Sequence, residues 1–204
     1  SQGRYAFVNQ PSIGLWNLNA LANAFVSLVS PEELTSILQT YEPTFRRQYF
    51  DLMARKLGMT DFIETDSELI NRLLLILAEE KVDYTNFFRS LCEYQPKGGG
   101  DFLTKLFRNS VEFKSWLADY DERLGRDPAL SQERRLKMLS INPKYIFRNY
   151  MAQEAIDAAE QKDYSLVNDL LHTLQAPYDE HPEMERYAGN PPNWASSISV
   201  SCSS

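Results

Sequence analysis

Cysteines and long apolar runs are scarce in this 204-residue sequence, and their scarcity narrows the classes of protein to consider. Two cysteines are too few for a disulfide framework and fit a reducing compartment. The longest apolar run, Leu73 to Ala78, is far shorter than the roughly 20 residues that span a bilayer. The chain does not open with a basic segment followed by an apolar one, so we expect no secretory signal and no membrane partner.

A surplus of basic residues is also missing. The 21 lysines and arginines are outnumbered by 28 aspartates and glutamates, which gives a formal net charge of -7. A general nucleic-acid binder needs excess positive charge to release counterions from phosphates, so we expect no nucleic-acid partner. The hydrophobic share of 43% is typical of folded soluble domains, and a chain of this length can bury a core without disulfides or metals. Composition therefore predicts a folded globular protein and leaves its function open.

The first residues lack an initiator methionine. The chain begins Ser1-Gln2-Gly3-Arg4 and runs directly into an apolar segment. We interpret it as a piece of a longer protein, whose chemistry can lie upstream of Ser1.

Apolar residues at helical spacing dominate the chain from Trp16 to Gln175 and predict an all-α fold. No segment of clear period-two alternation exceeds about five residues, so strands are not expected. We predict a helical domain over residues 1–176, with an extended lead-in at 1–15. Its first helix carries a stripe that we expect to face a core, formed by Leu18, Leu21, Ala22, Phe25, Leu28 and Val29.

Capping signals predict where several helices begin. Ser30 and Asp83 are typical N-cap residues, and Thr65 with Glu68 forms a capping-box pattern. Asp127-Pro128 and Asn142-Pro143 each pair a capping side chain with a proline, so we expect a helix to start at both, with Tyr145, Ile146 and Phe147 packing inward after the second. The helix that starts at Ser30 is expected to run to Leu57, with Gly58 as its C-cap, and to be broken or kinked at Pro43.

Residues 177–204 form a different segment, rich in proline and serine. Prolines at 177, 182, 191 and 192 cannot continue a helix. Tyr178, Tyr187 and Trp194 are aromatic anchors, so we predict a tail that lies extended against the helical domain.

A short pattern occurs twice. The stretch Ala78-Glu79-Glu80-Lys81-Val82-Asp83-Tyr84 resembles Ala159-Glu160-Gln161-Lys162-Asp163-Tyr164. Two copies about eighty residues apart do not make a repeat array, which needs at least three. We interpret them as two helical hairpins that share an aspartate cap.

Three patterns are weak candidates for binding sites. Lys97-Gly98-Gly99-Gly100 precedes a helix, but the phosphate-binding GxxxxGK[ST] pattern is absent and Asp101 follows, so a loop is favoured. The acidic stretch 119–122 lacks the glycine of a calcium loop, which favours a solvated helix face. His172 and His181 have no second ligand at metal-binding spacing, so a zinc site would need both histidines and both cysteines to converge.

The two cysteines differ in their surroundings. Cys92 follows Phe87, Phe88 and Leu91, and it is most simply a buried small hydrophobe. Cys202 is the third residue from the end and lies among serines, where a thiol has little core to bury it. An exposed thiol near a terminus can be oxidised reversibly, so Cys202 is the redox candidate, with an incidental terminal cysteine as the alternative.

Motifs at both ends and in the last third together resemble the C-terminal part of the selenoprotein O family. They span most of the chain, although residues 30–140 contribute little. The motifs are Gly3-Arg4-Tyr5, Asn9-Gln10-Pro11, Trp16-Asn17-Leu18, Asn142 to Tyr150, Pro177-Tyr178-Asp179-Glu180, Pro191-Pro192-Asn193-Trp194-Ala195 and Ser201-Cys202-Ser203-Ser204.

This resemblance implies a protein-kinase-like fold that transfers AMP from ATP to hydroxyl groups of proteins. It also implies that ATP and Mg²⁺ or Mn²⁺ bind in the N-terminal kinase-like part of the same protein, before the Gly3-Arg4-Tyr5 segment. We therefore expect no catalytic, nucleotide-binding or metal-binding residue in this chain. The expected location is the cytoplasm if the source is bacterial, or the mitochondrion as for eukaryotic relatives.

The resemblance gives Cys202 a specific role. The family ends in a cysteine or selenocysteine at this position, implied to pair with a cysteine of the activation segment upstream. Here Cys202 is then a free thiol, or it mispairs with Cys92. Arg148 is interpreted as a structural residue that reaches a carboxylate, with a nucleotide contact as the alternative, and Arg4 has no assigned task.

The functional hypothesis is the C-terminal part of a protein adenylyltransferase that modifies Ser, Thr or Tyr hydroxyls under redox control through Cys202. The chain alone is expected to be inactive. The alternative is a non-catalytic helical protein-interaction module.

Overall fold

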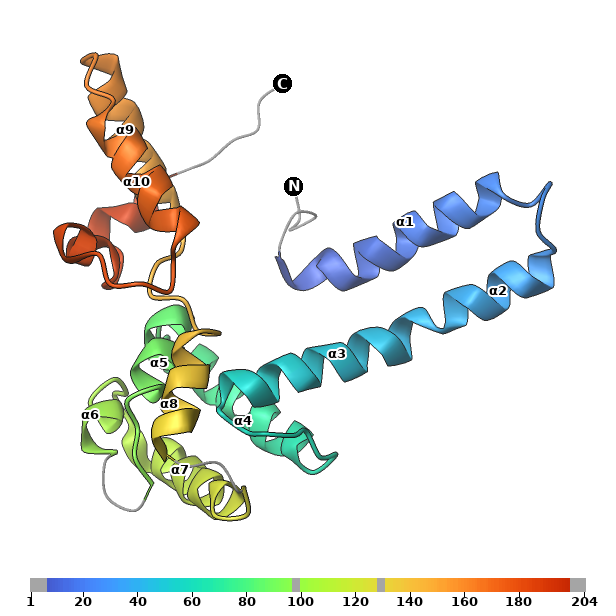
Figure 1. The fold of residues 1–204 in the computed structure, drawn as a ribbon, viewed down its shortest axis with the longest axis horizontal. Helices are drawn as coiled ribbons and strands as arrows, with labels where there is room; N and C mark the ends of the chain where they lie inside the picture. Colours follow the sequence, from blue (N-terminus) through green and yellow to red (C-terminus); the bar gives the residue numbers. More distant parts are fainter. Residues whose placement is uncertain (1–6, 97–99, 128–130, 199–204) are drawn as a thin grey trace. The chain divides into compact units, whose positions relative to one another are not determined.

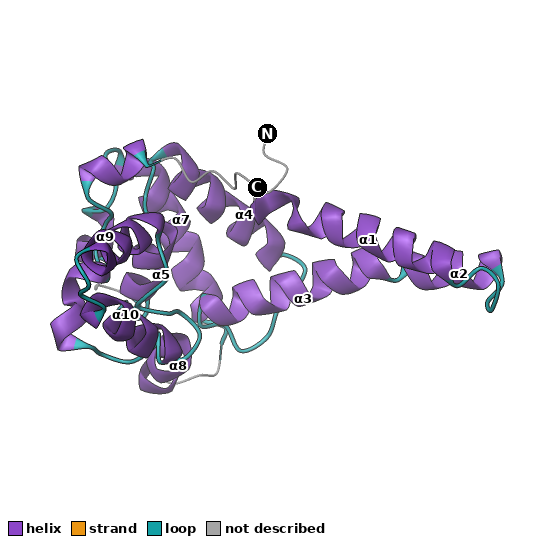
Figure 2. Cartoon of the chain, turned by 90° about the horizontal axis from the view of Figure 1, so that it is seen from above, coloured by secondary structure: helices purple, strands orange, loops and turns teal. Residues whose placement is uncertain are grey.

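The computed structural model describes residues 7–96, 100–127 and 131–198, and every regular element in these ranges is helical (Figures 1 and 2). The predicted all-α class is therefore confirmed. Ten α-helices are assigned there: α1 (Gln10–Ala24), α2 (Pro31–Gln39), α3 (Tyr41–Lys56), α4 (Asp66–Glu79), α5 (Tyr84–Leu91), α6 (Asp101–Thr104), α7 (Ser110–Leu124), α8 (Ser131–Leu139), α9 (Asn149–Glu160) and α10 (Ser165–Gln175). Short 3-10 helices occur at Phe7–Asn9 (η1), Pro182–Tyr187 (η2) and Asn193–Ser197 (η3).

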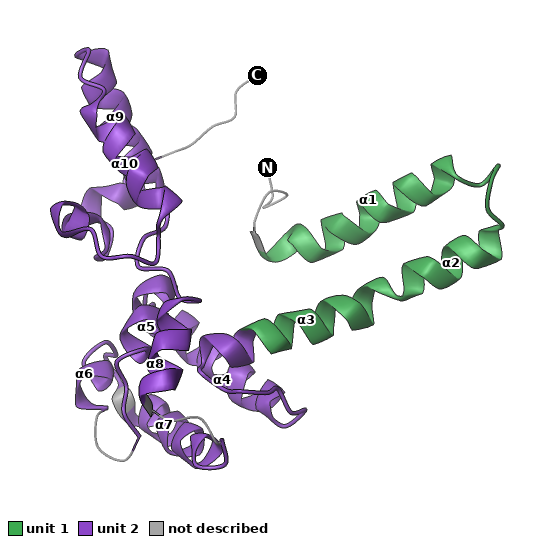
Figure 3. Cartoon of the chain, viewed as in Figure 1, with its two compact units in different colours: residues 1–52 green, residues 53–204 purple. Residues whose placement is uncertain are grey.

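The chain divides into two compact units, residues 1–52 and 53–204, coloured separately in Figure 3. This differs from the single helical domain expected over residues 1–176. The sequence offered no boundary signal at residue 52, because α3 runs through it without a glycine, a loop or a change in composition.

Unit 1 is a helical hairpin in which α1 runs out and α2 and α3 return beside it (Figure 3). The Tyr41 hydroxyl of α3 donates to the Pro11 carbonyl of α1 at 2.9 Å. Gly14 permits this approach, because a Cβ there would lie 2.7 Å from the Tyr41 hydroxyl oxygen.

The start of α1 corrects the expected extended lead-in at residues 1–15, of which only 7–15 are described. Helix already begins at Gln10, after η1. Pro11 occupies the first turn, where a proline costs no hydrogen bond and favours the helical φ. Pro11, which suggested an extended segment, therefore marks the start of a helix.

The apolar stripe of α1 is a second correction. Helix α1 has no buried residue, and Leu21, Phe25 and Leu28 are 55%, 43% and 78% exposed. Helix α1 also ends at Ala24, so Phe25, Leu28 and Val29 of the predicted stripe lie beyond it. Within the described residues this stripe covers no core of its own chain.

Two of the predicted helix starts are confirmed. The Ser30 hydroxyl accepts from the Glu33 N–H before α2, and the Asp83 carboxylate accepts from the Asn86 N–H before α5. The predicted break near Pro43 is also present, one turn earlier, since α2 ends at Gln39 and α3 begins at Tyr41. Gly58 follows α3 with φ of +74°, as a C-cap glycine requires.

A third predicted start is correct in position but not in its capping bond. Helix α4 begins at Asp66, directly after Thr65, but the Thr65 side chain makes no capping hydrogen bond. The Asp66 carboxylate accepts from the Ile63 N–H.

The start predicted at Asp127-Pro128 falls on residues 128–130, which lie outside the described residues. Asp127 itself accepts from the Thr60 N–H and hydroxyl, both at 2.6 Å. The start predicted at Asn142 is wrong. The Asn142-Pro143 segment is irregular, and α9 begins only at Asn149.

The core of unit 2 has an aromatic spine along α7. Phe107, Phe113, Trp116 and Tyr120 stack in succession, with neighbouring ring centroids 4.1, 5.7 and 4.9 Å apart. The Trp116 indole donates to the Leu69 carbonyl of α4 at 2.8 Å. Phe113, Trp116 and Tyr120 are spaced three and four residues apart along the helix, and all three are buried.

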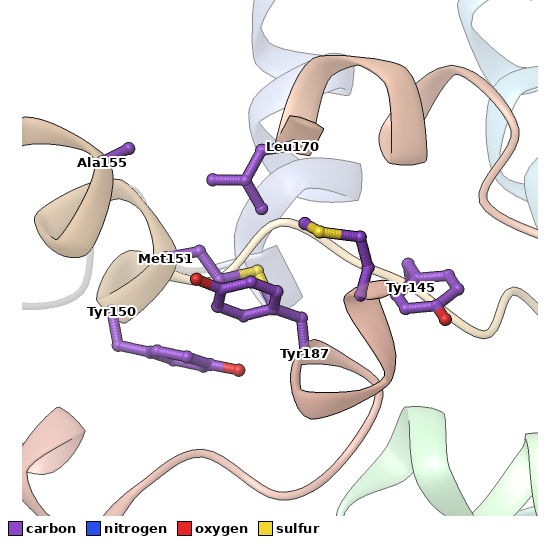
Figure 4. Close-up of a cluster of buried hydrophobic side chains, with 7 residues drawn as sticks. Tyr145, Tyr150, Met151, Ala155, Leu170 and Tyr187 are labelled. Carbon is purple, nitrogen blue, oxygen red and sulfur yellow. The ribbon is translucent and has the colours of Figure 1, made fainter. Parts of the chain in front are cut away.

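A second cluster joins α9, α10 and the residues after them. It contains Tyr145, Tyr150, Met151, Ala155, Leu170, Met184 and Tyr187. Figure 4 shows the Tyr187 ring lying among Tyr150, Met151 and Leu170. Because Met184 and Tyr187 are 4% and 3% exposed, this part of the predicted tail is a core element.

Candidate functional site

An apolar groove lies within unit 1, between the start of α1 and α3. Its volume is about 690 Å³. Phe45 and Leu52 line it while 41% and 50% exposed. The groove is lined by Val8, Gln10, Pro11, Tyr41, Phe45, Gln48, Tyr49 and Leu52. Its lining carries no charged side chain, so it is suited to an apolar partner surface.

Helix α1 and the turn after it add further apolar surface to unit 1. Trp16 and Leu21 of α1 are 63% and 55% exposed, and Val26 in the turn is 54% exposed. Large exposed apolar surfaces on a protein mark sites of contact with another surface. The groove and α1 together are therefore the candidate docking surface of unit 1. Sequence reasoning recognised the apolar residues and assigned them to a core, because periodicity does not distinguish a core from a partner.

The second candidate region is a polar junction in unit 2, built around the irregular segment 142–148. Asn142 is fully buried, and its amide donates to the Lys56 carbonyl at 2.8 Å and contacts the Cys92 sulfur at 3.6 Å. The Arg89 guanidinium of α5 donates to the Asn142 and Leu139 carbonyls. These bonds satisfy backbone groups that an irregular buried segment leaves unpaired.

Arg148 reaches a carboxylate, as its structural interpretation predicted. Its guanidinium makes a bidentate ion pair with Asp83, with N–O distances of 2.7 and 3.0 Å. Burial raises the pKa of Asp83, but hydrogen bonds from Arg148 and the Asn86 N–H outweigh it and hold that pKa below its ordinary value. Arg148 therefore positions the N-terminal cap of α5.

Lys144 binds the chain that follows α10. Its ammonium donates to the carboxylates of both Glu180 and Glu185. Burial lowers the pKa of Lys144, but these two bonds more than compensate and raise it above its ordinary value. Glu180 also accepts from Arg89 at 2.9 Å, and the bonds from Lys144 and Arg89 lower its pKa. Arg89, Lys144 and Arg148 are thus all paired with carboxylates. We therefore interpret the junction as a structural element that holds its segments together.

Cys92 is buried, as the sequence predicted, with 1% of its surface exposed. Burial raises the pKa of its thiol, so the reactive thiolate is disfavoured. The nearby Lys56 ammonium lies 4.7 Å from the centre of the Phe88 ring. Burial lowers the pKa of Lys56. Cys92 is therefore a core residue.

The structure brings His172 and His181 together, which the sequence did not indicate. Their ring centroids lie 5.8 Å apart, and His181 Nε2 lies 3.0 Å from the Ala176 carbonyl oxygen. Among the described residues, however, no three His, Cys, Asp or Glu side chains are grouped so that they could hold a metal ion. The same ranges contain no helix long and apolar enough to cross a membrane.

The acidic stretch 119–122 is part of α7, and its side chains diverge. Asp119 pairs with Arg72, Asp121 accepts from the Tyr94 hydroxyl, and Glu122 pairs with Arg126. Other residues singled out in the sequence, namely Arg4, Gly98, Gly99 and the redox candidate Cys202, lie outside the described residues.

The polar junction coincides with the sequence motif Asn142 to Tyr150, whose members differ in burial. Tyr145 and Tyr150 are buried, whereas Phe147 is 59% exposed, contrary to the inward packing expected for it. The roles of Lys144 and Glu180 were not predicted. Lys144 and Glu180 lie far apart in the sequence, so their spacing does not connect them. Both residues had been singled out only as members of two motifs that carry the family resemblance.

Comparison with known proteins identifies the family. The family model described as "Protein adenylyltransferase SelO" matches residues 1–175. The whole chain is also 42%, 45% and 44% identical to proteins named "Protein nucleotidyltransferase YdiU" from Myxococcus xanthus, Pseudomonas fluorescens and Vibrio vulnificus. In each case the chain spans 42% of the relative's length. Because the family model covers most of the sequence, the chain belongs to the SelO family of protein nucleotidyltransferases.

Proposed function

We propose that this chain is the C-terminal helical region of a protein adenylyltransferase that transfers AMP from ATP to Ser, Thr or Tyr hydroxyls of proteins. The family description and the nucleotidyltransferase relatives support this proposal. The chain matches about two fifths of each relative, so the activity is proposed for the parent protein.

The nucleotide and its Mg²⁺ or Mn²⁺ ion are assigned to the kinase-like part of the parent protein, outside this chain. Bound there, the ion would neutralise phosphate charge in a transfer in which the substrate hydroxyl gives up its proton, bonds to the α-phosphorus and displaces pyrophosphate. The described residues of the present chain contribute structural support to the parent protein. Asn142, Lys144 and Arg148 fix the helices of unit 2, and unit 1 offers an apolar surface.

The observation that carries the proposal is the uncovered apolar surface of unit 1. A stable protein rarely leaves a helix such as α1 without one buried residue while several of its large side chains are apolar. About three fifths of each relative lies beyond the part that this chain matches. We assign the α1 face and the 690 Å³ groove to contact with that remaining, catalytic part.

Redox control through Cys202 is part of the proposal. By exchange with an oxidised small disulfide, which leaves as two thiols, Cys202 and a cysteine of the catalytic part can form one reversible disulfide, which would couple activity to redox state. Cys92 is a poor alternative partner because it is buried and its thiol pKa is raised.

The docking role is tested by producing the remaining part of the parent protein separately and titrating it with this chain. Phe45→Glu places a charge in the groove and should weaken the association at least a hundredfold. Phe102→Glu is the matched control, because Phe102 is 40% exposed in unit 2 and Phe45 is 41% exposed in unit 1. Equal affinities for both variants, or no association of the wild-type chain, would contradict the docking role and favour an independent interaction module.

The location of the nucleotide site is tested by calorimetric titration of this chain with ATP and Mg²⁺, and again with Mn²⁺. No heat of binding is expected, and no AMP-labelled protein should appear with the isolated chain. Micromolar binding would contradict the assignment and place part of the nucleotide site here, with Arg4 and Arg148 as the first residues to replace.

A further inference from the structure

A row of large side chains forms one wall of the groove in unit 1. These residues follow one another about one helical turn apart on α3, and they are Tyr41, Phe45, Tyr49 and Leu52. The ring centroids of Tyr41 and Phe45 lie 6.1 Å apart, and those of Phe45 and Tyr49 lie 6.3 Å apart. Neighbouring ring planes differ by only 21° and 15°, so the rings repeat regularly along the helix. The repeat of the wall is close to the rise of four residues in an α-helix, which is about 6 Å.

The groove offers few partners for a bound backbone. Between Phe45 and Leu52 the wall is the interior of α3, whose N–H and C=O groups bond along the helix. On the opposite wall, the Pro11 carbonyl already accepts from the Tyr41 hydroxyl. Apart from Tyr41, the lining contributes three polar side-chain ends, those of Gln10, Gln48 and Tyr49. The groove therefore has no backbone edge to which an extended segment can pair.

An occupant of this groove has to satisfy its own backbone groups. A buried extended segment leaves N–H and C=O groups that need partners, whereas an α-helix pairs these groups within itself and presents only side chains. The wall from Tyr41 to Leu52 covers eleven residue steps of α3, or about 17 Å, which is about three helical turns. Both the chemistry and the length of the groove thus favour a helix.

We propose that one amphipathic helix of the catalytic part of the parent protein packs lengthwise along α3 and fills this groove. The proposal rests on the docking role given to unit 1 in the proposed function, and it specifies the form of the partner. About three fifths of each relative lies outside the match to this chain, and the helix is assigned to that part.

The groove also specifies the sequence pattern of this helix. Apolar side chains at every third or fourth position would each meet one member of the α3 row, because both helices have the same rise per turn. No charged side chain would lie along the centre of this face, because the groove lining carries no charge to pair with it. The expected partner is therefore an uncharged apolar stripe about three turns long.

Photo-crosslinking in the intact parent protein tests the form of the partner. The photoreactive residue p-benzoylphenylalanine replaces Phe45, Tyr49 or Leu52 in turn, and mass spectrometry locates the residue that each variant captures. The captured positions should belong to one segment of the catalytic part and shift by three or four residues from each variant to the next. Each step along α3 covers about 5–6 Å, which corresponds to three or four residues of a helix but only two of an extended strand.

The matched control places the same photoreactive residue at Arg47. This position is on α3 but does not line the groove, and it lies about 200° around the helix from Phe45. The Arg47 variant should capture no residue of the segment that the three groove variants capture.

The possible results separate the helix from the docking role itself. Captured positions that shift by two residues per step would overturn the helix and leave the docking role intact. Capture of only a second copy of this chain, or of nothing in the catalytic part, would overturn both.

A proline substitution in the captured segment provides a second test. Proline in the middle of that segment, at a position facing away from the groove, should weaken association of the separately produced catalytic part at least thirtyfold, because proline breaks a helix. Alanine at the same position should change the affinity less than threefold. Equal effects of proline and alanine would overturn the helix.

Discussion

The ion pair between Arg148 and Asp83 connects the starts of two helices, α5 and α9. The Asp83 carboxylate caps α5 through the Asn86 N–H and also accepts both ends of the Arg148 guanidinium, just ahead of α9. The two side chains are 16% and 19% exposed, so the pair is partly desolvated. Removal of either side chain leaves the charge of the other one unpaired, in a site that water reaches poorly.

Replacing Arg148 by Met should therefore lower the free energy of unfolding by about 1–3 kcal/mol, within the range for a partly buried pair that loses one charge. Urea unfolding at pH 7 measures the change. Arg126→Met is the matched control, because its pair with Glu122 is 64% and 68% exposed and should contribute less than about 0.5 kcal/mol. Equal effects of the two variants would contradict this assignment.

The same pair should make stability depend on pH. The pKa of Asp83 is lowered in the folded state, so its contribution is complete above the unfolded pKa of about 4 and is lost as pH falls through the lower folded value. The difference in stability between wild type and Arg148→Met should accordingly be constant above about pH 5 and shrink towards pH 3. Unfolding curves across this interval measure it, and a difference that does not shrink would contradict the linkage.

At the scale of elements, the pattern that occurs twice in the sequence has a specific backbone conformation. Lys81 and Lys162 occupy the same position in the two copies, and both have positive φ, of 55° and 64°. Each follows a helix, and the next residue donates back to a carbonyl five positions earlier, from Val82 to Leu77 and from Asp163 to Ala158. The two copies are therefore helix C-caps of the kind that usually contains glycine.

Glycine at either lysine position should stabilise the protein by about 0.5–1 kcal/mol, because a Cβ is unfavourable in this conformation. The thermal midpoint should rise for Lys81→Gly and for Lys162→Gly. Lys105→Gly is the control, because Lys105 follows α6 with an ordinary φ of -68° and gains nothing from glycine. A fall in midpoint for both test variants would show that the lysine side chains themselves stabilise these turns.

The end of α3 is capped by a side chain from another helix. The buried Tyr120 hydroxyl of α7 donates to the Leu57 carbonyl at 2.5 Å and accepts from the buried Arg134 guanidinium at 3.3 Å. Carbonyls at the end of a helix lack partners within it. This single hydroxyl therefore satisfies groups from two other segments.

Tyr120→Phe should lower the free energy of unfolding by about 1–3 kcal/mol, the cost of leaving buried polar groups unpaired. Chemical denaturation measures it. Tyr164→Phe removes a hydroxyl from a tyrosine that is 58% exposed and should have almost no effect. If the two variants have equal stability, the Tyr120 hydroxyl is not a cap.

The sequence predicted helices well because their signals are local. Stripe periodicity, the Ser30 and Asp83 caps and the Gly58 C-cap all act within a few residues of chain. The wrong start at Asn142 has a physical reason. The Asn142 amide binds the Lys56 carbonyl, which is distant in the sequence, and such tertiary competition for a capping group leaves no local trace.

The candidate sites were predictable to a smaller extent. The structural role of Arg148 and the burial of Cys92 followed from charge and neighbouring apolar residues. The docking surface did not follow, because Leu21 and Phe25 have the same helical spacing whether they face their own core or another surface. The Lys144 contacts with Glu180 and Glu185 join segments some forty residues apart, which spacing alone does not connect.

At the scale of the whole molecule, the uncovered apolar surface of unit 1 should cause self-association when this chain is studied alone. Sedimentation velocity should show a sedimentation coefficient that rises with concentration in the micromolar range. Replacing Trp16 and Phe25 together by Gln should reduce the effect, whereas Val111→Gln, at a site 67% exposed in unit 2, should not. A wild-type chain that stays monomeric throughout would contradict this expectation.

The boundary between the two units lies inside α3, between Leu52 and Met53. A protease cuts where backbone can unfold locally, and a helix interior resists this more than a loop does. Limited digestion should therefore not release the units at their boundary. A better cutting point for expression is Thr40, the single residue between α2 and α3, where neither helix is cut in its interior. A piece cut there would keep α3 whole and carry part of the groove with it.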